Sequence, residues 1–233
     1  MYRALDVCDV EYVASLNTIP VIDGCSNKYH PSQALADILT MSEIAGGVEK
    51  IGKVAWLGIE NNVSNTLAMA CHTLGIALYI ASPLVHENSI DEELTTIINT
   101  SSFIKRTSME EALQNASFIH TDTWVDMEYF DTDGNVKKEF KTEFEKREEL
   151  LLPYQISAQL LKAHNCNAKI MHCMPCHEGM EITRDAIDHK NSVIFYQAEN
   201  RLHIEKAMLW WLFQELKKPT LSGLSEEKQK LNS

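Results

Sequence analysis

The amino-acid sequence predicts an α/β protein with a doubly wound parallel sheet. Short apolar runs typical of buried strands alternate with stretches of helical periodicity along most of the chain. Gly46, Gly58 and Gly75 stand where three of these segments end. A chain of 233 residues is long enough to bury the core that such a sheet needs.

The segment before residue 50 predicts one strand and one helix. Residues 19–22 (Ile-Pro-Val-Ile) form a short apolar run, and residues 23–24 (Asp-Gly) mark a turn after it. Pro31 suits the first turn of a helix, where no backbone N–H is needed. Apolar residues recur at helical spacing as far as Ile44, and Gly46 ends the helix.

A βαβ unit follows. Residues 53–58 predict a strand that ends at a glycine, and residues 62–74 predict a helix stopped by the next glycine. Residues 76–81 predict a second strand, which a right-handed crossover places parallel to the first. The same patterns predict further strands at 102–105, 117–121, 168–172 and 192–196, and helices at 109–114 and 156–163.

Residues 128–150 interrupt this alternation. They are rich in Glu, Lys and Asp, contain a turn at residues 133–134, and predict a solvated insertion before the next helix. Residues 203–216 predict a final helix that carries Trp210 and Trp211. The polar tail from Lys217 is expected to fray.

Composition excludes several kinds of partner. The apolar fraction of 45% and the charged fraction of 23% are ordinary for a soluble globular protein. The net charge is −12 and no Lys/Arg-rich run stands out, so neither nucleic acid nor an anionic membrane is expected as a partner. We find no apolar signal segment and no stretch long enough to span a bilayer. We therefore expect a cytoplasmic chain whose 6 cysteines are free thiols.

The turn after the strand at residues 53–58 is where an open α/β sheet binds ligands. It lacks the G-x-G-x-x-G pattern, and Glu60 would repel a pyrophosphate, so no dinucleotide is expected. Asn61 and Asn62 open the following helix. Their amides either cap that helix or reach a polar ligand, and the residues alone leave both interpretations open.

Asp122 ends another predicted strand, at residues 117–121. An aspartate there is either a turn residue or a ligand for an ammonium group at the carboxyl edge of the sheet. Asp126 and Glu128 add negative charge close by in the sequence. Such a cluster suits a cationic amine if it faces the ligand.

The segment from Cys173 to His177 fits the C-x-x-C-H pattern of haem attachment. No export signal accompanies it, no second C-x-x-C completes a zinc site, and a thioredoxin-like pair would follow the first strand rather than a late one. We therefore expect no cofactor and no metal. Two interpretations remain, a buried thiol in a turn or Cys173 at the edge of a substrate site.

Several short segments share their order and spacing with a known family. They are Arg3, His30-Pro31-Ser32-Gln33, Asn61-Asn62, Thr121-Asp122-Thr123-Trp124, His172-Cys173-Met174-Pro175 and Glu199-Asn200-Arg201-Leu202-His203. With them the chain resembles the ornithine/aspartate carbamoyltransferases, nearest the ornithine branch, from Tyr2 to Phe213. This family transfers the carbamoyl group of carbamoyl phosphate to an amine through a tetrahedral intermediate, and phosphate leaves.

The resemblance implies a role for each matched residue. Carbamoyl phosphate would be bound by Arg3, His30, Gln33, Cys173, Met174 and Arg201, and the amino acid by Asn62, Asp122, Asp126 and Met127. His30, Arg201 and Cys173 would be catalytic. His30 would donate to the carbonyl oxygen, and Cys173 would accept a proton, which a thiolate does only where neighbours lower its pKa.

The resemblance also divides the chain and names its partners. The family's Ser-x-Arg-Thr phosphate motif lies well before the position of Arg3. Residues 1–45 would then be the C-terminal portion of the carbamoyl-phosphate domain, the remnant of a second α/β domain. Residues 46–202 would be the Rossmann-like amino-acid-binding domain, and residues 203–233 a closing helix and tail. The implied partners are carbamoyl phosphate, ornithine or a related amine, and further copies of the chain in a homo-oligomer, a trimer in the family.

Two departures from the family pattern add acid where the amine should sit. Asp126 and Glu128 replace the serine and glycine of the ornithine branch, and Glu178 stands where arginine is usual. They either favour a more cationic substrate or are neutral. The leading function is carbamoyl transfer to ornithine or a related amine. The alternatives are a non-catalytic or truncated member acting as a binding or assembly protein, and a redox or haem protein built on residues 173–177.

Overall fold

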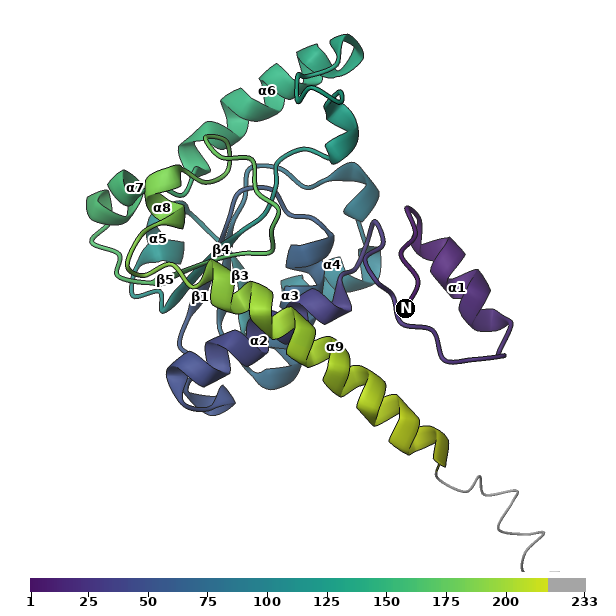
Figure 1. Cartoon of the computed structure of the whole chain (residues 1–233). Coiled ribbons are helices and arrows are strands. Elements are labelled where there is room, and N and C mark those ends of the chain that lie inside the picture. The colour runs from purple at the N-terminus through teal and green to yellow at the C-terminus, as the bar shows by residue number, and fades with distance from the viewer. Residues whose placement is uncertain (218–233) are drawn as a thin grey trace, which may run out of the picture.

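The computed structural model describes residues 1–217. A five-stranded sheet forms its centre, and all its strand pairs are parallel, in the order β3-β2-β1-β4-β5 (Figure 1). The strands are β1 (Val54–Leu57), β2 (Leu78–Ala81), β3 (Ile104–Arg106), β4 (Phe118–Thr121) and β5 (Lys169–His172). The predicted fold class is confirmed.

Helices fill most of the remaining chain. They are α1 (Val7–Ser15), α2 (Pro31–Ala45), α3 (Asn62–Leu74), α4 (Glu92–Thr100), α5 (Met109–Leu113), α6 (Lys141–Leu151), α7 (Ala158–Ala163), α8 (Arg184–Ile187) and α9 (Ile194–Lys217). Short 3-10 turns span Val48–Lys50, Glu87–Ser89, Met127–Tyr129, Lys138–Phe140 and Leu152–Tyr154. Among the helices of residues 1–217, none has both the length and the apolar character that a membrane span requires.

Both faces of the sheet are covered, and β1 shows how alternate side chains serve the two layers. Val54 and Trp56 pack with residues of α2, α3 and α4 on one face. Ala55 and Leu57 pack with residues of α5, α7 and α8 on the other. All four side chains are buried, as expected of a central parallel strand covered on both sides.

The sheet changes its direction of growth at β1. β2 and β3 lie on one side of β1, whereas β4 and β5 lie on the other. The turns that follow β1 and β4 therefore form a topological switch point, which is the position where open α/β sheets bind ligands. Asn61 follows β1 and Asp122 follows β4, so the fold itself brings these two polar side chains together.

The two long helices predicted early in the chain are confirmed with their terminating glycines. α2 begins at Pro31 and ends at Gly46, whose φ of 79° is left-handed. α3 covers residues 62–74 and ends at Gly75, with a φ of 70°. A glycine tolerates this conformation because it has no Cβ. The strands predicted at 53–58, 76–81, 102–105, 117–121 and 168–172 each contain or overlap an observed strand.

The strand predicted at residues 19–22 is wrong. Within residues 1–217 no strand lies beside this segment, and Tyr2 and Asp23 form only an isolated bridge next to it. Ile22 is buried, but Ile19 is 72% exposed. An apolar run cannot become a strand without a neighbour that satisfies its backbone hydrogen bonds.

The C-terminal prediction is also corrected. Residues 192–196 are not a strand, because α9 begins at Ile194 and continues through the start predicted at residue 203. Ile194 and Gln197 are both fully buried and lie on one helical face, whereas Phe195 is 66% exposed. α9 packs along α2 and then extends away from the sheet (Figure 1). The predicted fraying from Lys218 onward concerns residues outside the described part of the chain.

Patterning did not reveal α1, α4 or α6. The first two are capped by acids, because Asp6 accepts from the amide of Cys8 and Asp91 accepts from the amide of Leu94. The insertion at residues 128–150 is largely exposed, as predicted, but its second half forms α6. Leu151 at the end of α6 is buried in a small apolar cluster with Ile59 and Trp124.

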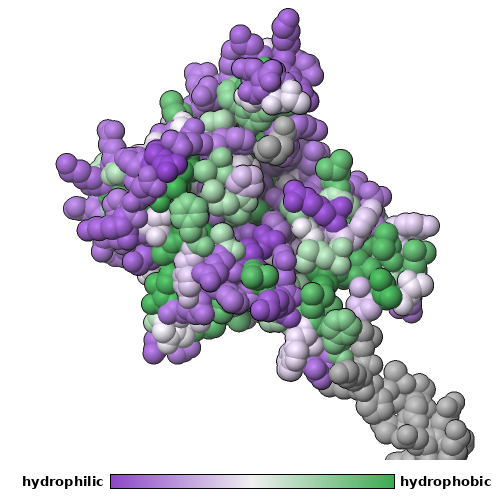
Figure 2. Space-filling view, in the orientation of Figure 1, coloured by the Kyte–Doolittle hydropathy of each residue, from purple (hydrophilic) through white to green (hydrophobic). Residues whose placement is uncertain are grey.

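Large apolar side chains remain exposed on α1 and on the part of α9 that leaves the body of the protein. Tyr12 on α1 is 67% exposed, and Trp210 on α9 is 65% exposed. Leu209, Trp211 and Phe213 are exposed beside Trp210. Figure 2 shows the apolar surface that covers α1. Apolar area of this kind commonly marks an interface.

Candidate active site

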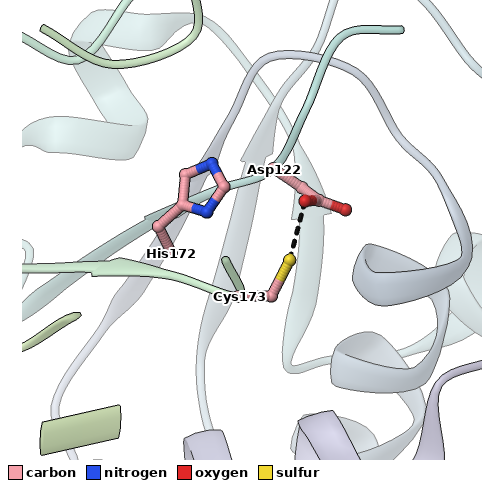
Figure 3. A group of neighbouring side chains, drawn as sticks. All are labelled: Asp122, His172 and Cys173. Carbon is pink, nitrogen blue, oxygen red and sulfur yellow. Dashed lines mark hydrogen bonds between the residues drawn. The ribbon is translucent and has the colours of Figure 1, made fainter. Parts of the chain in front are cut away.

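Three chain segments meet at the carboxyl edge of the sheet around Asp122. Asp122 directly follows β4 and is 6% exposed. Its Oδ2 accepts a hydrogen bond of 2.7 Å from Nδ2 of Asn61. Its Oδ1 accepts one of 2.7 Å from Sγ of Cys173, which follows β5 (Figure 3). Asp122 is therefore part of a built cluster and not only a turn residue.

Asn61 caps α3, which is one of the two interpretations that the sequence left open. Its Oδ1 accepts from the backbone amides of Val63 and Ser64, and Ser64 completes a capping box on α3. Its Nδ2 is thereby turned toward Asp122. The cap of α3 and the orientation of Asp122 depend on one amide group.

We expect Asn61→Ala to lower the free energy of unfolding by roughly 1–2 kcal/mol, the usual value of an N-cap side chain. Urea unfolding of the variant and the wild type measures this difference. Ser108→Ala is the matched control at the N-terminus of α5, where Ser108 caps by accepting from Glu111. The control should lose stability without altering the pKa of Cys173, whereas Asn61→Ala should change both. Equal stability of Asn61→Ala and the wild type would contradict this prediction.

Cys173 is held as a neutral thiol. Burial raises the pKa of Cys173 well above its ordinary value, and the negative charge and hydrogen bond of Asp122 raise it further. A thiolate at this position would need neighbours that lower the pKa, and these neighbours do the opposite. The expected thiolate role of Cys173 as a proton acceptor is therefore not supported by the geometry of the described residues.

Alkylation tests this protonation state. At pH 8, we expect iodoacetamide to modify Cys173 far more slowly than an unperturbed thiol, because only the thiolate reacts. Asp122→Asn should lower the pKa of Cys173 and accelerate its modification, as read by peptide mass spectrometry. Cys8 lies on α1 far from Asp122 in the chain and serves as the internal control, whose rate should be the same in both proteins. An unchanged rate at Cys173 would show that Asp122 does not hold the thiol proton.

His172 precedes Cys173 and contacts a second buried acid, Glu181, which the sequence did not single out. Its Nε2 lies 3.2 Å from Oε1 of Glu181, and its Nδ1 accepts from the backbone amide of Met174. The imidazole is thus neutral by its hydrogen bonds, with the proton on Nε2. Glu181 is fully buried and also accepts from the amide of His177.

The donor atoms of Asp122, His172 and Cys173 lie within 4.8 Å of one another, which is close enough for a metal (Figure 3). Each of these atoms already takes part in a hydrogen bond: both oxygens of Asp122, the thiol, and both nitrogens of His172. A metal would have to break several of them. The arrangement therefore fits a hydrogen-bonded cluster better than a metal centre.

A second group of site residues gathers around Arg201 on α9. Its Nη1 donates to Oε1 of Gln33 at 2.6 Å, and its Nη2 donates to Oγ of Ser32 at 3.1 Å and to Glu205 at 3.1 Å. Nη1 also lies 3.3 Å from Nε2 of His30. Arg201 thus reaches the first turn of α2, which the His-Pro-Ser-Gln segment begins.

His30 is neutral beside this guanidinium. Burial and then the charge of Arg201 lower the pKa of His30 to about 4. Because Arg201 can only donate, Nε2 of His30 accepts and Nδ1 carries the proton. Nδ1 of His30 and Nε of Arg201 are both buried and have no hydrogen-bond partner within residues 1–217. Two N–H donors are therefore left for an oxygen-bearing ligand.

Three further predicted site residues are Asn62, Arg3 and Asp126. Asn62 donates through Nδ2 to the carbonyl of Ser26 at 2.7 Å and to Sγ of Cys25 at 3.3 Å, so its amide hydrogens hold a loop. Arg3 is exposed, and its positive charge contributes to lowering the pKa of His30. Asp126 is half exposed and lies 2.9 Å from Nε2 of His86.

Two residues of the predicted site remain to be placed. Met174 is partly buried and packs against the apolar cluster on the α5, α7 and α8 face of the sheet. The side chain of Met127 lies outside what the structure describes. Glu60 needs a correction, because Arg106 pairs with it at 2.8 Å and balances the charge that was expected to repel a phosphate.

The predicted thiol state is confirmed for all six cysteines, which are free. Sequence reasoning missed the buried polar residues behind the site, namely Asp37, His120, Glu181 and Gln197. One signal was available for Asp37, since an acid lies on the apolar face of its helix, four residues after Gln33. The others lie within strands, turns or a helix whose start was misplaced.

Comparison with known proteins identifies the family of the chain. The family described as aspartate/ornithine carbamoyltransferase, Asp/Orn binding domain, matches residues 51–212. An ornithine carbamoyltransferase of Methylobacillus flagellatus is 35% identical over 213 residues, which cover 91% of this chain and 65% of that protein. One from Bacillus subtilis is 36% identical, covering 90% of this chain and 63% of the relative.

Solved structures give the same result. The ornithine carbamoyltransferase of Pyrococcus furiosus superimposes with a TM-score of 0.73 at 36% identity, covering 89% of this chain and 64% of that one. That of Thermus thermophilus has a TM-score of 0.71 at 32% identity, covering 90% and 64%. The chain thus spans slightly less than two thirds of the length of these relatives.

Proposed function

From the premise that this chain belongs to the aspartate/ornithine carbamoyltransferase family, we propose that it takes part in moving the carbamoyl group of carbamoyl phosphate to ornithine or a closely related amine. The observation that carries the proposal is that two neighbouring buried N–H donors, Nδ1 of His30 and Nε of Arg201, have no partner in the part of the chain that the structure describes. Carbamoyl phosphate offers them a carbonyl oxygen and an anionic phosphate.

Arg201 places a positive charge in one cluster, where Glu205 pairs with it, and Asp122 places a negative charge in the other, which suits an anionic and a cationic substrate. Arg201 would bind the phosphate, with Arg3 beside it, and neutral His30 would donate to the carbonyl oxygen as negative charge develops there. Gln33 and the segment of Cys173 and Met174 would hold the carbamoyl group. Donors aligned in this way stabilise the tetrahedral intermediate more than the substrate.

The acidic cluster would receive the amine. Asp122 would hold the ammonium group, and Asn62 and the segment containing Asp126 and Met127 would bind the rest of the amino acid. In the reaction the amine nitrogen forms a bond to the carbonyl carbon, the carbon–oxygen bond to phosphate breaks, and the nitrogen loses a proton. With Cys173 protonated, the carboxylate of Asp122 would take this proton.

A citrulline-forming assay tests the function. Purified chain with carbamoyl phosphate and ornithine should release citrulline and phosphate in equal amounts. Related amines assayed in parallel would show whether Asp126 and Glu128 favour a more cationic substrate. A folded sample that neither forms product nor binds carbamoyl phosphate by calorimetry would refute the proposal.

A second candidate function is that of a binding or assembly member of the family rather than an enzyme. The protonated thiol of Cys173 favours this candidate, because a thiol that donates to Asp122 does not accept the proton of the amine. Binding of carbamoyl phosphate without any citrulline formation would select this candidate over the first.

We also infer the arrangement of the protein from the same family membership. Residues 1–45 are assigned to the C-terminal portion of a carbamoyl-phosphate domain, residues 46–202 to the amino-acid domain, and residues 203–233 to a closing helix and tail. The exposed apolar side chains on α1 and α9 support a homo-oligomer. A cytoplasmic location fits small metabolic substrates. Light scattering and cell fractionation test these two points.

A further inference from the structure

A buried carboxylate lies behind the proposed site and touches neither proposed substrate position. Asp37 is on α2, one helical turn after Gln33, and is fully buried. Its Oδ1 accepts from Nε2 of Gln33 and from Nε2 of Gln197, each at 2.7 Å. Its Oδ2 lies 3.1 Å from Nε2 of His120 on β4. Three side chains from three elements converge on this one acid.

The contacts of Asp37 fix the direction in which two amides point. Since Nε2 of Gln33 donates to Asp37, Oε1 of Gln33 must face the other way, where it accepts from Arg201 at 2.6 Å. Since Nε2 of Gln197 also donates to Asp37, its Oε1 is free to accept from the backbone amide of His172 at 2.9 Å. The Asp37 carboxylate is therefore connected to the Arg201 cluster through Gln33, and to the turn before Cys173 through Gln197.

The buried charge of Asp37 is paired with His120. His120 is fully buried and stacks on Trp56, with ring centroids 5.0 Å apart. Burial by itself would lower the pKa of His120, but the charge and hydrogen bond of Asp37 outweigh burial and raise it. Buried ion pairs of this kind add little stability over a well-packed apolar pair, so stability alone does not account for this one.

We propose that Asp37 is a positioning residue: its carboxylate orients Gln33 and Gln197, and through them holds Arg201 and the His172–Cys173 turn in the geometry that receives carbamoyl phosphate. The importance of this geometry rests on the proposed function. The orientation itself is a property of the protein without ligand and can be measured separately.

Asp37→Asn is the test, because asparagine keeps the volume and replaces one acceptor oxygen by an NH2 donor. Glu43→Gln is the matched control. Glu43 lies on the same helix, also contacts α9 through Tyr196 and Asn200, and does not touch Gln33. By calorimetry with carbamoyl phosphate, Asp37→Asn should weaken binding about tenfold or more, and Glu43→Gln should leave it unchanged.

Nitrogen-15 NMR of the unliganded protein gives a readout that does not depend on the substrate. Asp37→Asn should shift the side-chain amide signals of Gln33 and Gln197 and the Nε signal of Arg201, and Glu43→Gln should shift none of them. If wild-type chain does not bind carbamoyl phosphate, the proposed function fails while this readout still decides the role of Asp37. Unshifted Gln33 and Arg201 signals in Asp37→Asn overturn the positioning role.

A second variant covers the case in which Asp37→Asn does not fold. Gln197→Leu keeps the contacts of Asp37 with His120 and Gln33, and removes those of Gln197 with Asp37, with His120 and with the backbone amide of His172. It should shift the backbone amide signal of His172 and leave the Nε signal of Arg201 in place. A His172 signal that does not move, or an Arg201 signal that moves as much as that of His172, overturns the proposed network.

Discussion

Replacing Arg201 with alanine is expected to weaken carbamoyl phosphate binding by roughly 100-fold to 10,000-fold, because two charge-assisted hydrogen bonds of roughly 1.5–3 kcal/mol each are lost. Arg201 supplies the positive charge at the centre of its cluster and donates to both Gln33 and Ser32. Its Nε is also buried and has no hydrogen-bond partner among residues 1–217. Calorimetric titration of the variant and the wild type measures the change.

Arg184→Ala is the matched control for Arg201→Ala. It removes the same side chain and charge from α8, where Arg184 is exposed and pairs with Asp188 and Glu178. Binding by the Arg184 variant should equal that of the wild type. Equal affinity in the Arg201 variant would show that this arginine does not bind the anion, and would leave His30 and Arg3 as the remaining candidates.

Acid is expected to destabilise the protein through His30. The folded pKa of His30 is about 4, below the ordinary value of 6.5, so between these values the unfolded chain binds a proton that the folded chain does not. The contribution of His30 to the free energy of unfolding is therefore present in full above pH 6.5 and is lost as the pH falls toward 4. The shift corresponds to roughly 3 kcal/mol at the acid end of this window. Urea unfolding at intervals from pH 7 to pH 4 measures it.

Two variants separate His30 from other titrating groups. His30→Gln should flatten the loss of stability between pH 6.5 and pH 5, above the range in which most carboxylates titrate. His72→Gln, at an exposed position of α3, should leave the profile unchanged. The pH dependence due to His120 has the opposite sign, because its pKa is raised in the folded protein. Its contribution to the free energy of unfolding is present below pH 6.5 and is lost as the pH rises through the folded pKa. A profile unaffected by His30→Gln would contradict the prediction.

The sheet and its principal helices could be predicted because their signals are local. Apolar runs identified all five strands, and Pro31, Gly46 and Gly75 identified the ends of α2 and α3. The order of the strands along the chain then placed Asn61 and Asp122 at one edge, since parallel strands share their carboxyl ends. Those two residues do meet there, 2.7 Å apart.

The errors have a common physical cause, which is dependence on distant partners. Residues 19–22 have the composition of a strand, but none of residues 1–217 offers them a pairing edge. Residues 192–196 were also predicted as a strand, but packing of Ile194 and Gln197 against the body of the protein selects a helix from residue 194. Tertiary contacts decide such short apolar runs, and a sequence pattern does not contain them.

The protonation state of Cys173 could not be predicted from the sequence either. Cys173 could be a thiolate or a thiol according to which charge lies beside it, and the structure places Asp122 there rather than a cation. The role of Asp37 was hidden because its partners Gln33, Gln197 and His120 come from separate parts of the chain. Hydrogen-bond networks of this kind follow from the fold and not from spacing.

Asn61 has a consequence for how this protein can change. One amide caps α3 and orients Asp122, so a substitution there that alters substrate choice also removes part of the stability of the scaffold. Asp126 and Glu178 are exposed and form ion pairs with His86 and Arg184, so we expect substitutions there to cost less stability. In a library selected for new amine substrates, we expect accepted changes to concentrate at these outer positions, and changes at Asn61 to be accepted only after a stabilising mutation elsewhere.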